Sequence, residues 1–365
     1  MQFKRKNAFT NHYDFVHSPH YMELKEAKTL KDLAKITGFT ESTISRTLNG
    51  IGTKYRISKD TQKKIIEAAN EANFSFNENA RGLRLRKTMT VGFIVPDISN
   101  SFFAKMASLV EREARLHKYA VFLCDSDNST EVEQASITLL QKRKVDGIIV
   151  CPIGLESEHL VKLYKETPLV LVDRYFPKID IPFVTSNDVL DSYKVVQHLI
   201  SKGHKKIACI QGVEHTSQND MRIEGYKKAL EDNDIAFDPK LLIGNSFSEE
   251  NGYNAAQQII GMPKTKRPTA IFSLSSIITL GALKSFTEAG LKIPEDFSIV
   301  SFDEQEYSAL LATPLTTIGQ PKEEMGTKAF QMLLAQMDSE KEENLKQKGL
   351  LLPTQLNFRD SIKAP

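Results

Sequence analysis

Few cysteines and no long apolar segments limit what this sequence can encode. The three cysteines, Cys124, Cys151 and Cys209, each lie in an apolar run and have no paired spacing, which argues against a disulfide framework and for a reducing compartment. No stretch approaches the roughly 18 consecutive apolar residues of a membrane-spanning helix. Residues 1–21 also lack the apolar centre of a signal peptide. The sequence therefore predicts a soluble, cytoplasmic protein.

Sequence motifs of the common enzyme classes are absent as well. There is no Walker loop, no G-x-G-x-x-G after a strand, no G-x-S-x-G elbow, and no His/Cys set with metal spacing. His12, His17 and His20 fall in residues 1–26, a leader that we expect to be flexible, and they fit no closed metal site. We therefore expect a protein that is not an enzyme and that needs no metal or cofactor.

Charge is divided unevenly along the chain. Residues 1–87 contain 17 Lys and Arg against 9 Asp and Glu, and the remainder contains 31 against 37, although the whole chain has a net charge of only +2. A basic segment joined to an acidic body is typical of a polyanion-binding module fused to a regulatory domain.

Residues 29–50 have the pattern of two short helices separated by a glycine. Gly38 is expected to end the first helix in a left-handed cap, which glycine adopts without steric cost. Thr40 is a candidate N-cap of the second helix. The expected buried positions are Leu30, Leu33, Ala34 and Ile36 in the first helix, and Ile44 and Leu48 in the second. This pattern favours a helix-turn-helix, whose second helix lies in the DNA major groove, over an ordinary αα-hairpin.

A third helix is expected to begin at Ser58, with Ser58 and Thr61 as candidate caps, and to complete a three-helix domain over residues 27–76. Its apolar residues recur at helical spacing, at Ile65, Ile66, Ala69 and Ala72. Residues 77–88 follow with Gly82 and a high density of arginine, so they are expected to form a linker that is helical only when held in place.

From Met89 onward, short apolar runs alternate with helical segments. The runs are residues 91–97, 120–125, 146–152, 168–173, 206–212, 269–275 and 297–303, and the helical segments between them are 102–116, 132–143, 156–164, 189–200, 222–230, 251–260 and 279–289. This alternation predicts parallel sheets covered by helices on both faces. Ligands bind to such sheets at the carboxyl ends of the strands.

In order and spacing, these stretches resemble the lac repressor (LacI/GalR) family of bacterial transcription regulators. The similarity extends from Thr29 to Ser361, and its main segments are TLKDLAKITGFTESTISRTLNG, NENARGLR, VGFIVPDISNSFF, VDGIIVCP, RIEGYKKAL, IPEDFSIVSFDE and LPTQLNFRDS. The resemblance implies a dimeric repressor or activator with an all-α helix-turn-helix headpiece, a hinge helix at 77–88, and a core at 89–365 like the periplasmic sugar-binding proteins. We expect two doubly wound parallel-sheet lobes, lobe 1 at about 89–185 and 316–345, and lobe 2 at about 186–315 and 346–365.

The resemblance also implies which residues contact operator DNA. Glu41, Ser42 and Arg46 correspond to positions that face base edges. Arg46 can contact guanine with two hydrogen bonds. Glu41 either accepts a hydrogen bond from the amino group of cytosine or is only a carboxylate that the helix dipole favours at the start of the helix. The side chains expected to meet phosphates are Thr29, Thr40, Thr43, Ser45 and Asn49.

In the hinge, four residues match the family motif, with Leu83 at the position that wedges between bases of the minor groove. The four are Asn77, Ala80, Arg81 and Leu83. Phe76 stands where the family usually has proline.

The effector cleft is expected to be lined by residues from both lobes. By position these are Phe102, Phe103, Asp173, Arg222, Ser275 and Asp303. Carboxylates and a guanidinium facing across a cleft suit the hydroxyls of a sugar or a sugar phosphate. Ser275–Ser276 stand where the family commonly has Asn-Asp, and Asn187–Asp188 reverse its usual order, so the effector is expected to be unusual, or control has passed to a protein partner.

The sequence favours a ligand-controlled operator-binding regulator of carbohydrate-utilisation genes over two other functions. A sugar-binding transport protein would share the core, but it would need a signal peptide and has no use for Arg46 or Leu83. An enzyme on an α/β scaffold would need one of the missing catalytic motifs. The regulator explains most of the sequence.

Overall fold

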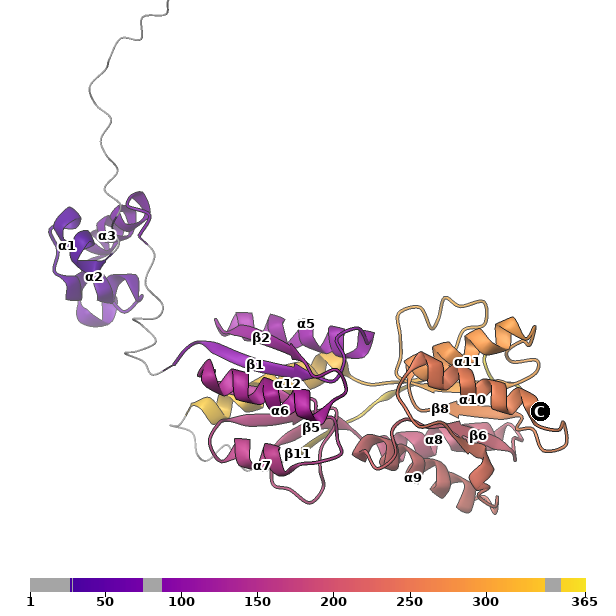
Figure 1. Cartoon of the computed structure of the whole chain (residues 1–365). Coiled ribbons are helices and arrows are strands. Elements are labelled where there is room, and N and C mark those ends of the chain that lie inside the picture. The colour runs from indigo at the N-terminus through magenta and orange to yellow at the C-terminus, as the bar shows by residue number, and fades with distance from the viewer. Residues whose placement is uncertain (1–26, 28, 75–86, 339–348) are drawn as a thin grey trace, which may run out of the picture. The chain divides into compact units, whose positions relative to one another are not determined.

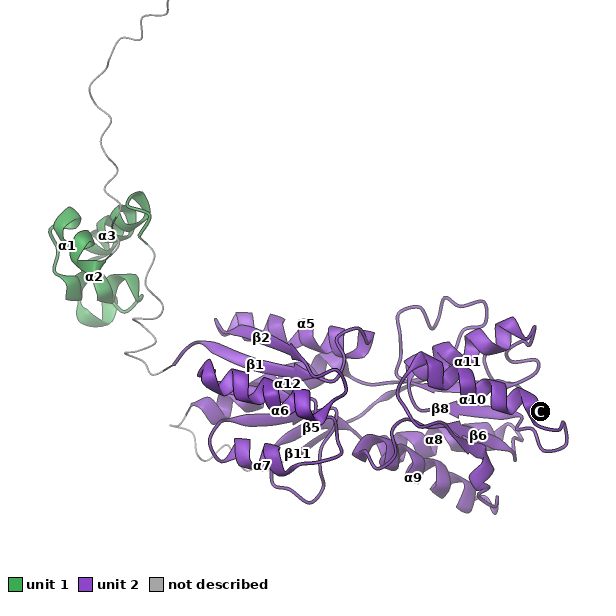
Figure 2. Cartoon of the chain, in the orientation of Figure 1, with its two compact units in different colours: residues 1–85 green, residues 86–365 purple. Residues whose placement is uncertain are grey.

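Two compact units make up the chain, residues 1–85 and 86–365 (Figure 2). The computed structural model describes residues 27, 29–74, 87–338 and 349–365. Within these residues no helix is both long and apolar enough to cross a membrane.

Within its described residues, the first unit contains three helices and one short 3-10 turn. They are α1 (Leu30–Thr37), α2 (Glu41–Leu48), η1 (Thr53–Tyr55) and α3 (Lys59–Glu71). The predicted caps are confirmed: Gly38 ends α1 with φ +72°, and the hydroxyls of Thr40 and Ser58 accept from the backbone amides of Thr43 and Thr61. The local sequence thus determines where each of these helices begins and ends.

A small apolar core holds the three helices together. It is formed by Ala27, Leu33, Ile44, Ile65, Ala69 and Ala72, with Leu30, Ala34 and Leu48 packed against it. The prediction that Ile36 and Ile66 are buried is wrong, since they are 42% and 44% exposed. At about 3.6 residues per turn, each lies a quarter turn or more away from the centre of its helix's buried face.

Lobe 1 of the second unit is a six-stranded parallel sheet with helices on both faces (Figure 1). Its strands, in spatial order, are β11 (Gly349–Leu352), β5 (Phe183–Ser186), β4 (Leu169–Val172), β3 (Gly147–Val150), β1 (Thr90–Val95) and β2 (Ala120–Asp125). Helices α5 (Ser101–Leu116) and α12 (Lys322–Met337) share one apolar core, and α6 (Thr130–Lys142) and α7 (Glu158–Tyr164) share the other. Burial on both faces explains why β1, β3 and β4 are almost uniformly apolar.

Lobe 2 repeats this architecture with a second six-stranded sheet. Its strands, in spatial order, are β12 (Gln355–Asn357), β10 (Thr316–Gly319), β9 (Ser298–Phe302), β8 (Ala270–Ser273), β6 (Ile207–Ile210) and β7 (Leu242–Ile243), which follows η2 (Pro239–Leu241). Only β12 is antiparallel to its neighbour. Helices α8 (Asp188–Ser201) and α9 (Ser217–Glu231) cover one face, and α10 (Glu249–Gly261) and α11 (Ser276–Glu288) cover the other. The predicted pair of doubly wound lobes is confirmed.

The chain passes between the lobes three times, and two passages differ from the prediction. The first follows β5 at Ser186, as expected. However, residues 316–319 pair with β9 and therefore belong to lobe 2, and residues 349–352 pair with β5 and belong to lobe 1. Both segments are only four residues long, so their sheet membership depends on which strand offers a free edge, which the sequence pattern does not record.

Candidate functional site

In the first unit, the side chains expected to read bases are exposed on α2. Glu41, Ser42 and Arg46 are all solvent-exposed. Ser42 and Arg46 are four residues apart and therefore lie on the same helix face. The geometry is compatible with insertion of this face into a major groove.

Several side chains expected at phosphates already have partners within the first unit. The Thr29 hydroxyl accepts from the Asp32 amide at 3.2 Å, and Thr40 accepts from the Thr43 amide at 3.3 Å. Asn49 Nδ2 donates to the Ser45 carbonyl at 2.6 Å. These residues therefore stabilise helix ends in the free protein. For Asn49 the sequence predicts only a phosphate contact. The hinge residues Asn77, Ala80, Arg81 and Leu83 lie outside the described residues.

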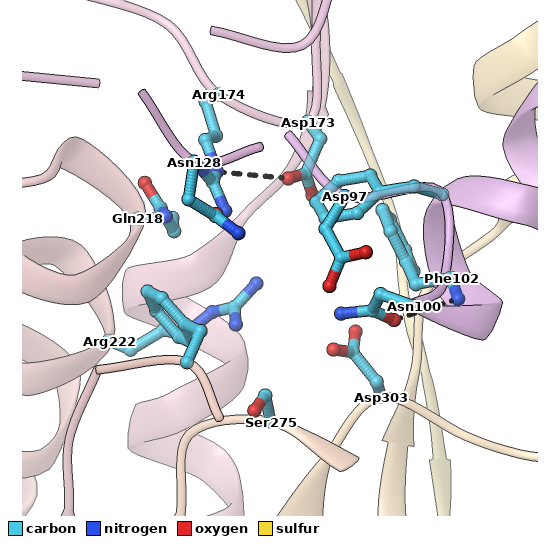
Figure 3. A pocket seen from close by; sticks show the side chains of 12 residues that line it. Asp97, Asn100, Phe102, Asn128, Asp173, Arg174, Gln218, Arg222, Ser275 and Asp303 are labelled. Atoms are coloured by element: carbon cyan, nitrogen blue, oxygen red, sulfur yellow. Dashed lines mark hydrogen bonds and ion pairs between the residues drawn. The ribbon is translucent and has the colours of Figure 1, made fainter. Parts of the chain in front are cut away.

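In the second unit, one cavity between the lobes is lined by all six residues expected to bind an effector (Figure 3). Phe102, Phe103 and Asp173 come from lobe 1, and Arg222, Ser275 and Asp303 from lobe 2. Sequence reasoning missed the other six lining residues, which are Asp97, Asn100, Asn128, Arg174, Gln218 and Phe247. Most of the twelve lie just after a strand, at the carboxyl ends of the two sheets, where open α/β folds bind ligands.

A positional signal exists for some of the missed residues. Asp97 is the last residue of a predicted strand, and Asn128 and Arg174 each follow closely after one. Asn100 caps α5 by accepting from the Phe102 amide at 3.0 Å. Phe247 gave no such signal, because the strand before it, β7, has only two residues.

Asp173 and Asp303 occupy equivalent places in the two lobes. Each directly follows a central strand, each has a left-handed backbone with φ of +67° and +69°, and each is 7% exposed. Burial raises the pKa of Asp173 to about 6, although Arg174 and Arg222 oppose this rise. The Asp303 carboxylate accepts from Gln320 Nε2 at 2.7 Å. Two buried acids thus face the same cavity from opposite sides.

Arg174 adds a guanidinium between two phenylalanine rings. Its Nη1 donates to the carbonyls of Pro152 and Ile153, both at 3.2 Å, and its Nε lies 3.6 Å from the Asp173 carboxylate. Its Cζ is 5.5 Å from the ring centroid of Phe103 in lobe 1 and 5.7 Å from that of Phe247 in lobe 2. Arg174 therefore contacts both lobes.

Arg222 is buried at the floor of the cavity. Its Nε donates to Asp188 at 3.1 Å, its Nη1 donates to the Leu274 carbonyl at 2.7 Å, and its Cζ lies 3.6 Å from the Phe302 ring centroid. Burial lowers its pKa, but the charges of Asp188, Asp303 and Asp173 more than compensate, so the net pKa is raised. The expectation that Arg222 opens a helix is wrong, because α9 begins five residues earlier, at Ser217. The first turn of α9 is polar, facing the cavity, and so lacks the apolar pattern of a helix.

Gln218 is the most unusual of the missed residues. It is 3% exposed, and neither its Nε2 nor its Oε1 has a hydrogen-bond partner within the described residues. A buried amide without partners is destabilising by about 1–3 kcal/mol. It therefore marks a position where a bound molecule would supply one acceptor and one donor.

The residues that depart from the family pattern have structural partners here. The Ser275 hydroxyl caps α11 by accepting from the Ile278 amide at 3.3 Å. Ser276 accepts from Gln305 Nε2 at 2.9 Å, and Gln305 in turn accepts from Ser101 of lobe 1 at 2.9 Å. Asp188 holds Arg222. The two serines thus serve a helix cap and a bridge between the lobes.

Comparison with known proteins identifies both units. Residues 29–77 match the family described as bacterial regulatory proteins, lacI family, and residues 88–353 match the periplasmic binding proteins and sugar binding domain of LacI family. The HTH-type transcriptional repressor PurR of Aliivibrio fischeri (strain MJ11) is 32% identical over 84% of this chain and 90% of its own. The ribose operon repressor of Haemophilus influenzae is 30% identical over 92% of this chain and 98% of its own.

A solved structure agrees with these matches. A LacI family transcriptional regulator from Enterococcus faecium with bound ribose has a TM-score of 0.66 and 28% identity, covering 76% of this chain and 99% of that one. These relatives are named as transcriptional repressors or regulators and not as enzymes. The chain belongs to the LacI family of bacterial regulatory proteins, DNA-binding transcription regulators whose core is a domain of the sugar-binding type.

Proposed function

We propose that the protein is a homodimeric repressor of carbohydrate-utilisation genes, controlled by a small neutral sugar bound between its lobes. The supporting observation is the cavity in Figure 3, where carboxylates, guanidinium groups and phenylalanine rings from both lobes converge. Such an operator-binding protein acts in the cytoplasm.

The chemistry of the cavity suits a polyhydroxylated ring. Sugar hydroxyls donate to Asp173 and Asp303 and accept from Arg174 and Arg222, while the carbon-bound face of the ring packs on phenylalanine. Gln218 offers one further donor and one further acceptor. Because these groups come from both lobes, they favour a ligand that contacts both at once.

The charge balance favours a neutral sugar over a sugar phosphate. Each lining arginine already has a carboxylate partner: Arg222 has Asp188 and Arg174 has Asp173. Asp97 and Asp303 add further carboxylates to the lining. A phosphate binds best to unpaired cations or bidentate arginine, whereas each lining arginine here already has a carboxylate within 3.6 Å. Ribose is the first neutral sugar to test, because it is bound in the Enterococcus faecium relative.

Sugar binding is proposed to change the angle between the lobes. The cavity holds only about 30 Å³ of free space, room for about two water molecules. A pentose therefore needs the lobes to part or their lining side chains to move. An effector shifts the balance between two lobe arrangements only by the difference in its affinity for them, typically about 1–3 kcal/mol.

On the DNA side, we assign one half-site of a pseudo-palindromic operator to each subunit of the dimer. Base contacts are assigned to Glu41, Ser42 and Arg46. Phosphate contacts are assigned to Thr29, Thr40, Thr43, Ser45 and Asn49, and the hinge contacts to Asn77, Ala80, Arg81 and Leu83. The hinge joins the core at Thr88, whose backbone amide donates to Asp146 at 2.7 Å.

The experiment pairs a ligand screen with operator binding. The full chain is titrated with ribose, neutral hexoses and ribose 5-phosphate while its melting temperature is recorded, since a ligand of the native state raises that temperature. Operator sequences are selected from random DNA, and their affinity is measured with and without the sugar that stabilises the protein. We expect a neutral sugar to bind and to change operator affinity.

Two variants show whether binding occurs in this cavity. Gln218→Leu is expected to weaken sugar binding and raise the melting temperature of the free protein, because it removes an unpartnered buried amide. Gln258→Leu, at an exposed site on α10, is the matched control. If no sugar binds, or if ribose 5-phosphate alone binds, the neutral-sugar proposal is wrong. If no sugar of either kind binds, control by a protein partner becomes the better explanation of Ser275–Ser276, whereas binding of ribose 5-phosphate alone would indicate a sugar-phosphate effector.

A further inference from the structure

Arg46 of α2, the helix expected to enter the major groove, packs against an aromatic ring. The Arg46 guanidinium lies over the ring of Tyr55, with Cζ 4.0 Å from the ring centroid. Tyr55 belongs to η1, the turn after α2, and is 47% exposed. This aromatic contact lies on the surface and outside the apolar core of the first unit.

The turn that carries Tyr55 is fixed to both neighbouring helices. The Ile51 amide donates to the Arg46 carbonyl at 3.0 Å, and Gln62 of α3 donates from Nε2 to the Ile57 carbonyl at 2.7 Å. A side chain at Gly52 would collide with Gln62, since its Cβ would lie 2.8 Å from the Gln62 Cδ. Tyr55 is therefore held at a defined place beside α2.

The stacking leaves the hydrogen-bonding edge of Arg46 available. A cation–π contact uses the flat face of the guanidinium, whereas all five N–H donors point outward in its plane. A bidentate contact to guanine needs that edge. An arginine side chain also loses rotamer freedom when it is held against a base, and the stack removes part of that freedom before the protein binds DNA.

The charges around the turn are also unpaired. No carboxylate among the described residues forms an ion pair with Arg46, Lys54 or Arg56, whereas Lys63 and Lys64 of α3 pair with Glu67 and Asp60. Arg56 has a left-handed backbone with φ +56°, a conformation that non-glycine residues seldom adopt. Lys54 and Arg56 are exposed on either side of Tyr55. Unpaired exposed cations beside a recognition helix suit the phosphates that flank a base contact.

We propose that Tyr55 is a positioning residue for base reading, and that its turn is part of the DNA interface. Tyr55 holds Arg46 extended for a guanine contact, and Lys54 and Arg56 contact the adjacent phosphates. The inference rests on the proposed base contact of Arg46 and adds the residue that orients it.

The test measures the full-length chain on its selected operator, on operators with single base pairs exchanged, and on random DNA. The variants are Tyr55→Leu, Tyr55→Phe, Arg46→Ala and the double variant Tyr55→Leu/Arg46→Ala. Tyr55→Leu is expected to weaken operator binding roughly two- to fivefold, the range of an exposed cation–π contact. It should also reduce discrimination at the base pair that Arg46 reads and leave random-DNA affinity unchanged. Tyr55→Phe keeps the ring and should bind like the wild type.

The double variant separates positioning from an independent effect. If Tyr55 acts through Arg46, the double variant binds no more weakly than Arg46→Ala alone. Separately, Lys54→Ala and Arg56→Ala should weaken binding to all sequences alike and lower the slope of log affinity against log salt by about 0.9 each.

Each contrary result has a distinct meaning. Wild-type discrimination by Tyr55→Leu, alongside lost discrimination by Arg46→Ala, overturns the positioning role and leaves the proposed function intact. Tighter operator binding by Tyr55→Leu also overturns it, because the stack would then withhold Arg46 from DNA. If Lys54→Ala and Arg56→Ala leave the salt slope unchanged, the turn does not contact phosphates and is not part of the DNA interface. If the wild type prefers no sequence at all, the proposed function itself is wrong.

Discussion

Replacing Asp173 with Asn should stabilise the free protein in a way that depends on pH. Asp173 is buried among apolar and charged neighbours, and burial raises its pKa from 3.8 to about 6. Asn keeps the size and keeps an acceptor for the Cys151 thiol, which donates to the carboxylate at 3.7 Å. Asn also tolerates the left-handed backbone at φ +67° better than most residues. The substitution therefore removes the charge and keeps the shape, while Arg174 loses its ion pair but keeps its hydrogen bonds to the Pro152 and Ile153 carbonyls.

The expected magnitude follows from the pKa. Because the pKa of Asp173 is raised in the folded protein, its contribution to stability is greatest below pH 3.8 and is lost as the pH rises through about 6. Asn does not ionise and escapes that loss. The gain in unfolding free energy of Asp173→Asn over the wild type should be about 1 kcal/mol at pH 4.5 and about 3 kcal/mol at pH 7.5.

The assay is urea unfolding at a series of pH values and one fixed protein concentration. Far-UV circular dichroism is the suitable signal, because the sequence contains no tryptophan. Asp173→Ala is the control, since it removes the charge but also the acceptor, and is strained at positive φ. A gain of equal size at pH 4.5 and 7.5, or a loss at both, would contradict the reasoning. We also expect Asp173→Asn to bind sugar more weakly, because a binding carboxylate is lost.

Four further substitutions probe other parts of the molecule. Arg46→Ala should weaken operator binding by about 1–3 kcal/mol and relax preference at one base pair; an equal loss on random DNA in the same titration would exclude base reading. Arg222→Ala should lower the unfolding free energy of the core by about 3–5 kcal/mol, because Asp188 is left buried without its partner. A negligible loss in urea unfolding would show that this pair does not stabilise the fold. Thr47→Val should stabilise the first unit by about 1 kcal/mol in thermal unfolding, since the Thr47 hydroxyl is buried without a partner in the described residues. Leu83→Ala should weaken operator binding but not sugar affinity, and equal losses in both titrations would argue against a hinge role.

The sequence predicted those elements that repeat one local pattern over several residues. The strands β1, β3, β4, β6, β8 and β9 are buried apolar runs, and Thr40 and Ser58 are cap residues that act within one turn. Strand β7 was missed because its two residues are too few to show a pattern, and β10 was missed because its sequence, TTIG, is not an apolar run. The pairing of both strands depends on residues far away in the chain.

The cavity was predictable to the extent that strand ends can be located. Asp173 and Asp303 follow recognisable strands, so their convergence could be expected from the fold. Gln218 and Phe247 could not be found in this way, because their position depends on how α9 and β7 meet the opposite lobe. The partner of Arg222 was equally hidden, since Asp188 lies on a different helix. Because Asp188 would lose its partner, Arg222→Ala is expected to affect folding as well as the effector response.

Because the chain passes back and forth between the lobes, lobe 1 cannot be completed early in synthesis. Translation delivers β1–β5 first, yet the core of lobe 1 includes Met325, Phe330 and Leu333 of α12, and β11 covers the outer edge of β5. Both arrive only after the strands β6–β10 of lobe 2 have been synthesised. Until then the nascent lobe 1 exposes an apolar face and an unpaired strand edge, features that promote misassembly. Lobe 1 is thus synthesised first, but it cannot complete its core and its sheet until the strands of lobe 2 and then α12 and β11 have been synthesised.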